Sequence, residues 1–148
     1  MNNLKSMNLL LVEDSENDID LFKYCLNKNK IHVNLTVIDN GDDAIDYVKE
    51  LSQDGQNAFP DLVLLDINLP GANGIEILKE IKENEVTKTI PVVMLTSSKH
   101  DEDIIKSYSN HANCFLQKPI DLSSFQKVVT MFEEFWFTVV TLPTSNLN

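Results

Sequence analysis

Four polar stretches of the sequence each follow a run of apolar residues, and their side chains have the chemistry of a metal and phosphoryl site. Glu13-Asp14 follows LLLV, Asp66 follows LVLL, Thr96 follows VVML, and Lys118 follows CFLQ. Carboxylate oxygens are the ligands that Mg²⁺ prefers in proteins. An ammonium group and a hydroxyl beside a metal-bound carboxylate suit the oxygens of a phosphoryl group. These side chains can act together only if the fold brings the ends of the four apolar runs to one place.

Hydrophobic periodicity predicts five strands that alternate with five helices. Strands are predicted at residues 8–12, 32–38, 61–65, 90–95 and 112–116. One helix follows Ser15, a second begins at Gly41, and three more are predicted at 74–82, 101–109 and 121–135; a polar loop is expected at 52–60. Three strands are apolar on both faces, which is typical of parallel sheets covered by helices on both sides. We therefore predict one doubly wound, flavodoxin-like α/β domain with strand order 2-1-3-4-5, spanning residues 1–148 with a core at about 7–135.

In an open parallel sheet, ligands bind outside the carboxyl ends of the strands. Strands one and three are neighbours in the predicted order, so we expect Glu13, Asp14 and Asp66 to converge, with Thr96 and Lys118 beside them. Three close carboxylates raise each other's pKa unless a cation lies among them, which favours Mg²⁺. We expect this edge to open to solvent, so that Asp66 need not be buried.

Simpler roles remain open for the same residues. Asp66 could cap the loop after its strand, Thr96 could be a helix N-cap, and Lys118 could be a surface lysine held extended by Pro119. Asp61 is expected to begin its strand in solvent. The spacing of His111 and Cys114 could be half of a metal site, but no second ligand pair accompanies it.

The four stretches, with Pro70 and Gly74 behind Asp66, resemble the receiver domain of two-component response regulators over residues from about 7 to 135. The resemblance implies that Asp66 accepts a phosphoryl group from a phosphohistidine on a sensor histidine kinase. It also implies a divalent ion, Mg²⁺ or Mn²⁺, bound by Asp14, Asp66 and the backbone carbonyl of Asn68. The chain would then be a phosphorylation switch that assists its own phosphotransfer and dephosphorylation, not a turnover enzyme.

The same resemblance implies roles for the remaining site residues. Glu13 would bind the metal directly or through water, and Lys118 and Thr96 would hold phosphoryl oxygens. Phe115 occupies the position of an aromatic switch residue whose rotamer follows the Thr; because it lacks a hydroxyl, it can report only by burial. Two positions would tune the lifetime of the aspartyl phosphate: Asn68 and Ser98.

Two other classes are open for an Asp at the end of a strand. A phosphatase of the haloacid dehalogenase type also uses such an Asp with Mg²⁺, but it needs a second acid two residues later, where this chain has Asn68. A flavin-binding electron carrier on the same fold should cradle phosphate in its first loop. Here that loop begins with Glu13 and Asp14, which repel phosphate unless a metal is bound.

Composition bears on partners and on location. The chain has 12 basic and 23 acidic residues and a formal net charge of −11, and every basic residue is Lys. A net-negative chain without Arg is poorly suited to nucleic acid, whose phosphates are held by clustered Arg and Lys. No apolar run approaches the roughly 20 residues that a membrane span needs. We therefore expect a cytoplasmic protein that contacts neither nucleic acid nor membrane.

Apolar residues continue beyond the last predicted helix. Phe132, Phe135 and Trp136 fit its inward face, but the extension at 136–148 carries a further apolar set: Phe137, Val139, Val140 and Leu142. This set either folds back on its own domain or forms a self-associating or partner surface, since aromatic residues are enriched at interfaces. The segments HANCFLQKP and EEFWFTVVTLP resemble the small stand-alone response regulators of phytochromes, which implies a homodimer through the last helix, fifth strand and tail. This group shares Glu13 in place of the first Asp of the wider receiver pattern.

Overall fold

The strand order of the protein is the predicted one. The computed structural model describes residues 7–28, 32–54, 59–97, 100–101, 114–118, 121, 123–124, 126–127 and 130. Five strands form one parallel sheet in the order β2-β1-β3-β4-β5. Their bounds are β1 Met7–Val12, β2 Val33–Ile38, β3 Leu62–Asp66, β4 Val92–Thr96 and β5 Cys114–Gln117.

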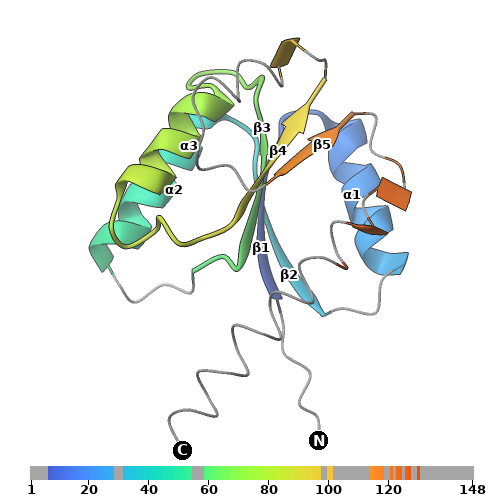
Figure 1. Cartoon of the computed structure of the whole chain (residues 1–148), viewed down its shortest axis with the longest axis horizontal. Coiled ribbons are helices and arrows are strands. Elements are labelled where there is room, and N and C mark those ends of the chain that lie inside the picture. The colour runs from blue at the N-terminus through green and yellow to red at the C-terminus, as the bar shows by residue number, and fades with distance from the viewer. Residues whose placement is uncertain are drawn as a thin grey trace, which may run out of the picture.

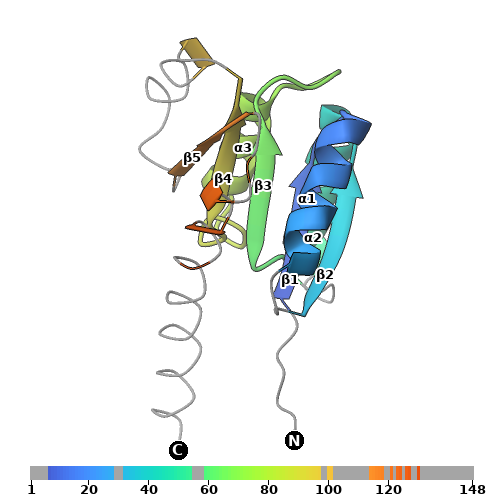
Figure 2. The ribbon, with the colours of Figure 1, turned by 90° about the vertical axis from the view of Figure 1, so that its right-hand side faces the viewer.

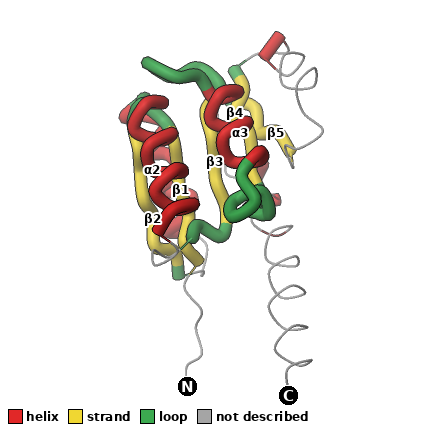
Figure 3. The backbone as a smooth tube through the Cα atoms, turned by 90° about the vertical axis from the view of Figure 1, so that its left-hand side faces the viewer, coloured by secondary structure: helices red, strands yellow, loops and turns green. Residues whose placement is uncertain are grey.

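Three helices within the described residues cover the two faces of the sheet: α1 Glu16–Lys28, α2 Gly41–Asp54 and α3 Gly74–Glu83. Helix α1 lies on one face (Figures 1 and 2), and α2 and α3 lie side by side on the other (Figure 3). Polar side chains cap their first turns, as the sequence predicts for Ser15. Ser15 Oγ accepts a hydrogen bond from Asp18 N at 3.3 Å, and Asn73 Oδ1 accepts one from Glu76 N at 3.0 Å.

Successive residues of each central strand pack into different cores, which explains why these strands are apolar on both faces. One core lies under α1 and contains Leu9, Leu11 and Leu64 with Phe22 of the helix. The other core lies under α2 and α3. It contains the alternate strand residues Leu10, Val12, Val63 and Leu65, together with Val48 of α2 and Ile81 of α3. Since side chains alternate across a strand, two helical layers need apolar residues at every position.

The sheet register places the polar strand ends side by side. Val12 of β1 pairs with Leu65 of β3, so Glu13 and Asp66 follow at the same level. Thr96 of β4 pairs with Gln117 of β5, and Lys118 N donates to Thr96 O at 2.7 Å. The predicted convergence of these residues at one edge is therefore a consequence of parallel pairing.

Two local expectations were wrong. Helix α2 continues through Asp54, so residues 52–54 are helical rather than the start of a loop, and in this last turn Ser52 Oγ donates to Lys49 O at 2.7 Å. Asp61 is half-buried, because its Oδ2 accepts a hydrogen bond from Asn8 N at 2.8 Å.

Some predictions lie outside the described residues. These are the helix at 101–109 beyond residue 101, His111, Pro119, and the apolar residues from Phe132 onward, including the whole extension at 136–148. Within the helix predicted at 121–135, residues 121, 123, 124, 126, 127 and 130 are described, and all of them except Asp121 are helical.

Candidate functional site

Three carboxylates gather at the carboxyl ends of β1 and β3. Glu13, Asp14 and Asp66 each offer one oxygen, and these oxygens lie within 4.8 Å of one another. Asp14 is exposed, but Glu13 is 0% and Asp66 is 2% exposed. The expectation of an Asp66 open to solvent was therefore wrong. Carboxylates packed this closely fit a divalent ion with oxygen ligands.

The first residue of α3 contributes to the burial of Asp66. A Cβ added at Gly74 would lie 2.4 Å from Asp66 O and 2.6 Å from Ile67 Cα, so only a glycine allows this approach. Gly74 N also donates to Ile67 O at 2.9 Å. The helix start thereby fixes the backbone that carries Asp66.

Lys118 is the cation of the site. Its Nζ lies 2.7 Å from Glu13 Oε1, 2.9 Å from Asp66 Oδ2 and 3.0 Å from Asp18 Oδ2. Burial alone lowers the pKa of a lysine, but here the hydrogen bonds to Glu13, Asp66 and Asp18 prevail and the pKa of Lys118 is raised. The ammonium is therefore charged at every physiological pH, and Lys118 is not a free surface residue.

Among the described carboxylates, Glu13 has the pKa that departs most from its ordinary value. Burial raises the pKa of Glu13 from 4.5 to about 7. The hydrogen bonds from Lys118 and from Ser15 N oppose this shift, and the charge of Asp66 adds to it. The predicted repulsion from Asp66 is thus present, but it is a smaller cause than desolvation.

Thr96 ends β4 with its side chain fully buried, and its Oγ1 has no hydrogen-bond partner among the described residues. A buried hydroxyl left without a partner is costly, so it is ready to bind a ligand oxygen. The proposed N-cap role of Thr96 has no supporting contact in the described part of the chain.

Two loops at this edge are joined through Asp101, which sequence reasoning missed. Asn68 N donates to Asp66 Oδ1 at 3.2 Å, and the Asn68 side-chain amide donates to Asp101 Oδ2 at 3.3 Å. Ser97 N donates to the same Asp101 oxygen at 3.0 Å, and Asp101 is 8% exposed. The contact between Asn68 and Asp101 joins residues 33 positions apart, so it leaves no local pattern in the sequence.

The remaining predicted residues divide into described and undescribed ones. Phe115 of β5 is half-buried, packs against the core under α2 and α3, and pairs in register with Met94. Ser98 and the apolar set of the tail lie outside the described residues.

The start of α2 holds the loop that carries Asn68. Gly41 N donates to Pro70 O at 2.9 Å, and Ala72 N donates to Asp42 Oδ1 at 3.1 Å. Gly71 has φ +79°, a conformation that favours glycine. The sequence indicated that a helix begins at Gly41-Asp42, but it did not indicate that these residues contact the loop after β3.

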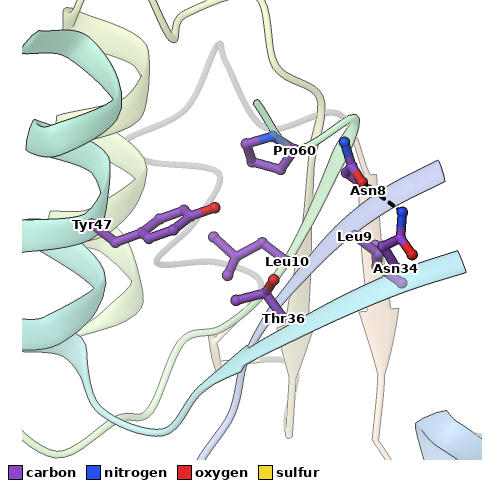
Figure 4. A pocket seen from close by; sticks show the side chains of 7 residues that line it. All are labelled: Asn8, Leu9, Leu10, Asn34, Thr36, Tyr47 and Pro60. Atoms are coloured by element: carbon purple, nitrogen blue, oxygen red, sulfur yellow. Dashed lines mark hydrogen bonds between the residues drawn. The ribbon is translucent and has the colours of Figure 1, made fainter. Parts of the chain in front are cut away.

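A cavity of about 110 Å³ has none of the acidic-site residues in its lining. Asn8 and Asn34, near the starts of β1 and β2, line it with Tyr47 and Pro60 (Figure 4), and Asn34 Nδ2 donates to Asn8 Oδ1 at 3.1 Å. In parallel α/β sheets ligands bind at the other edge, so the acidic cluster remains the candidate site.

The fold and this edge define a class of protein: a parallel five-stranded α/β domain with three carboxylates, a lysine and a buried hydroxyl at its strand ends. The family of response regulator receiver domains matches residues 9–130, and the chain belongs to this family. Membership leaves no place for the haloacid dehalogenase or flavin-carrier alternatives. Within the described residues, no helix has the length and apolar run required to cross a bilayer.

Among its relatives, the chain is 41% identical to "Response regulator Rcp1" of Synechocystis sp. over 135 residues, which cover 91% of this chain and 92% of the relative. The Mn²⁺-bound form of response regulator Rcp1 matches with a TM-score of 0.71 and 39% identity, covering 88% of this chain and 94% of that one. The phosphorylated cyanobacterial phytochrome response regulator RcpA matches with a TM-score of 0.73 and 36% identity, covering 91% and 96%. The chain is thus similar to phytochrome-associated response regulators along most of its length.

Proposed function

We propose that this protein is a cytoplasmic phosphorylation switch in which Asp66 accepts a phosphoryl group from a sensor histidine kinase, with Mg²⁺ or Mn²⁺ at the site. One observation carries the proposal: the buried Asp66 carboxylate lies within reach of Glu13 and Asp14 and 2.9 Å from the Lys118 ammonium. Similarity to a Mn²⁺-bound and to a phosphorylated response regulator supports it.

In the proposed reaction, an Asp66 oxygen attacks the phosphorus atom of a kinase phosphohistidine, in line with the bond between that phosphorus and the histidine nitrogen. That bond breaks, its electron pair stays on the imidazole, and a mixed anhydride forms on Asp66. Glu13, Asp14, Asp66 and the Asn68 carbonyl would hold the metal, which supplies positive charge to the phosphoryl oxygens. Lys118 supplies the second positive charge. The chain assists this transfer, and the later hydrolysis, by position rather than by turnover of a substrate.

The switch follows from the unpartnered Thr96 hydroxyl. A phosphoryl oxygen on Asp66 gives this hydroxyl the acceptor that it lacks among the described residues, so Thr96 is drawn toward Asp66. Phe115 lies in the neighbouring strand and would follow by changing its burial. Asn68 and Ser98 come two residues after Asp66 and Thr96 in the sequence and would tune the lifetime of the aspartyl phosphate.

Phosphorylation of Asp66 is tested with acetyl phosphate and Mg²⁺. The parent should gain the mass of one phosphoryl group, located on Asp66, and chelation of the metal should prevent the gain. Asp66→Asn should abolish the gain, and Asp14→Asn should raise the Mg²⁺ concentration that the gain requires, since it replaces one carboxylate ligand. Asp61→Asn is the matched control, since it makes the same change at the opposite end of β3. Equal incorporation by Asp66→Asn and the parent would contradict the proposal.

We propose a phytochrome-type kinase as the partner, on the similarity to phytochrome response regulators. Phosphotransfer profiling against the histidine kinases of the host tests it: the phytochrome-type kinase should transfer fastest. Faster transfer from a kinase of another class would reject this partner while leaving the Asp66 proposal intact.

The output is proposed to pass by protein contact. The formal net charge of −11 disfavours nucleic acid, so the phosphorylated face would meet a protein. We further propose a homodimer through the last helix, β5 and the apolar residues of the tail. Deletion of the residues after Glu134 should then yield a monomer in light scattering. An unchanged mass would indicate that the tail packs on its own domain.

A further inference from the structure

Lys118 has a third acidic partner outside the cluster of Glu13, Asp14 and Asp66, which we call the acidic triad. A lysine ammonium has three N–H donors, and in this protein three carboxylates surround it: Glu13, Asp66 and Asp18. Asp18 comes from the first turn of α1 and is not among the carboxylates that gather for a metal. Its Oδ2 lies 3.0 Å from Lys118 Nζ, and its side chain is 24% exposed.

Asp18 is fixed by a closed ring of contacts. Glu13 Oε2 accepts from Ser15 N at 3.0 Å, and Ser15 Oγ accepts from Asp18 N at 3.3 Å. Asp18 Oδ2 then pairs with Lys118, and Lys118 returns to Glu13 Oε1 at 2.7 Å. The helix cap thus sets the place of the Asp18 carboxylate, and the carboxylate sets the place of the ammonium.

In the function proposed above, the other two partners of Lys118 would change their bonding when the site is loaded. Asp66 would form a bond to phosphorus, and Glu13 would bind the metal, directly or through water. Of the three described partners, only Asp18 would hold the ammonium unchanged. Resting on the function proposed above, we propose that Asp18 is a positioning residue for phosphoryl transfer, which keeps the flexible Lys118 side chain aimed at Asp66.

Asp18 has two opposing effects on a phosphoryl group. Its bond orients Lys118, whereas its negative charge repels the phosphoryl oxygens. The charge is partly exposed and therefore screened by solvent, while the short charge-assisted bond acts directly on the ammonium. Orientation prevails, so loss of the acceptor slows transfer, and loss of the charge alone does not.

Variants at position 18 separate these effects. Asp18→Ala removes both acceptor and charge, and it should slow phosphorylation by acetyl phosphate about tenfold, as expected for one lost charge-assisted hydrogen bond. Asp18→Asn keeps an oxygen acceptor and should stay within about twofold of the parent. The Mg²⁺ dissociation constant should change by less than about twofold in both, because Asp18 lies outside the acidic triad. Asp20→Ala is the control, an exposed acid on the same helix.

A double-variant cycle tests whether Asp18 acts through Lys118. In a Lys118→Ala background, Asp18→Ala should cause no further loss of rate. Three results overturn the inference: an Asp18→Ala rate equal to or above that of the parent, equal slowing by Asp18→Asn, or full additivity with Lys118→Ala. Each leaves the proposed function standing, because the parent is still modified on Asp66. A parent that is not modified on Asp66 overturns the proposed function and this inference together.

Discussion

Gly74→Ala tests the close approach of α3 to the strand that carries Asp66. The added Cβ would lie 2.4 Å from Asp66 O, whereas ordinary contact begins at 3.4 Å, so the helix or the strand end must move by about 1 Å. Helix propensity alone favours Ala by up to about 1 kcal/mol, but backbone overpacking costs about 1–3 kcal/mol, and we expect overpacking to prevail. A displacement of about 1 Å at the reacting carboxylate is expected to slow phosphorylation about 100-fold.

The assay compares unfolding and phosphorylation in the same samples. The net loss of about 2 kcal/mol or less should lower the melting temperature of Gly74→Ala by up to about 8 °C, and its rate of modification by acetyl phosphate should fall far more than this loss explains. Asn73→Ala is the matched control: it removes the α3 cap, at about 1 kcal/mol, without adding an atom near Asp66. A parent-like rate in Gly74→Ala, or equal slowing in both variants, would refute the reasoning.

Three further predictions concern individual side chains. Thr96→Val removes a hydroxyl that has no partner among the described residues, so stability should be unchanged or higher by up to about 1 kcal/mol, while beryllofluoride binding weakens in calorimetry. Lys82→Met removes an ammonium that donates to two backbone carbonyls and should destabilise by about 1–3 kcal/mol in urea unfolding; a neutral result would contradict it. Burial raises the pKa of Asp61 above 3.8, so the folded state binds that proton more tightly and the ionised group lowers stability at neutral pH. Asp61→Asn should therefore be more stable than the parent at pH 7, with an advantage that shrinks as the pH falls through the raised pKa toward 3.8; a constant difference would count against this account.

Local patterns in the sequence predicted the scaffold well. Runs such as LLLV and LVLL indicate strands buried on both faces, and both runs are strands. A strand covered on two faces needs apolar residues at consecutive positions, so this feature is visible in the local sequence. The site residues were predictable for a related reason. Polar groups directly after such runs must lie at the carboxyl edge, and pairing of Val12 with Leu65 brings Glu13 and Asp66 together there.

Burial and pKa were less predictable. Asp66 was expected to face solvent, yet Gly74 packs against its backbone and Lys118 against its carboxylate. The raised pKa of Glu13 arises mainly from desolvation, which depends on everything packed around it. Neither effect is a property of nearby residues in the chain.

The sequence by itself determined the element types, the strand ends that carry charge and the acidic balance of the chain, since helical and strand periodicity act over a few residues. Only the tertiary structure decided three contacts. These are the ion pair of Lys118 with Asp18, the hydrogen bonds of Asp101 that join two loops, and the hydrogen bond by which Asp42 contacts the loop after β3. The contacts of Asp18 with Lys118, of Asn68 with Asp101 and of Asp42 with Ala72 each join residues 30 or more positions apart. They depend on side-chain reach and on helix placement over the sheet, and both are fixed only when the two cores close.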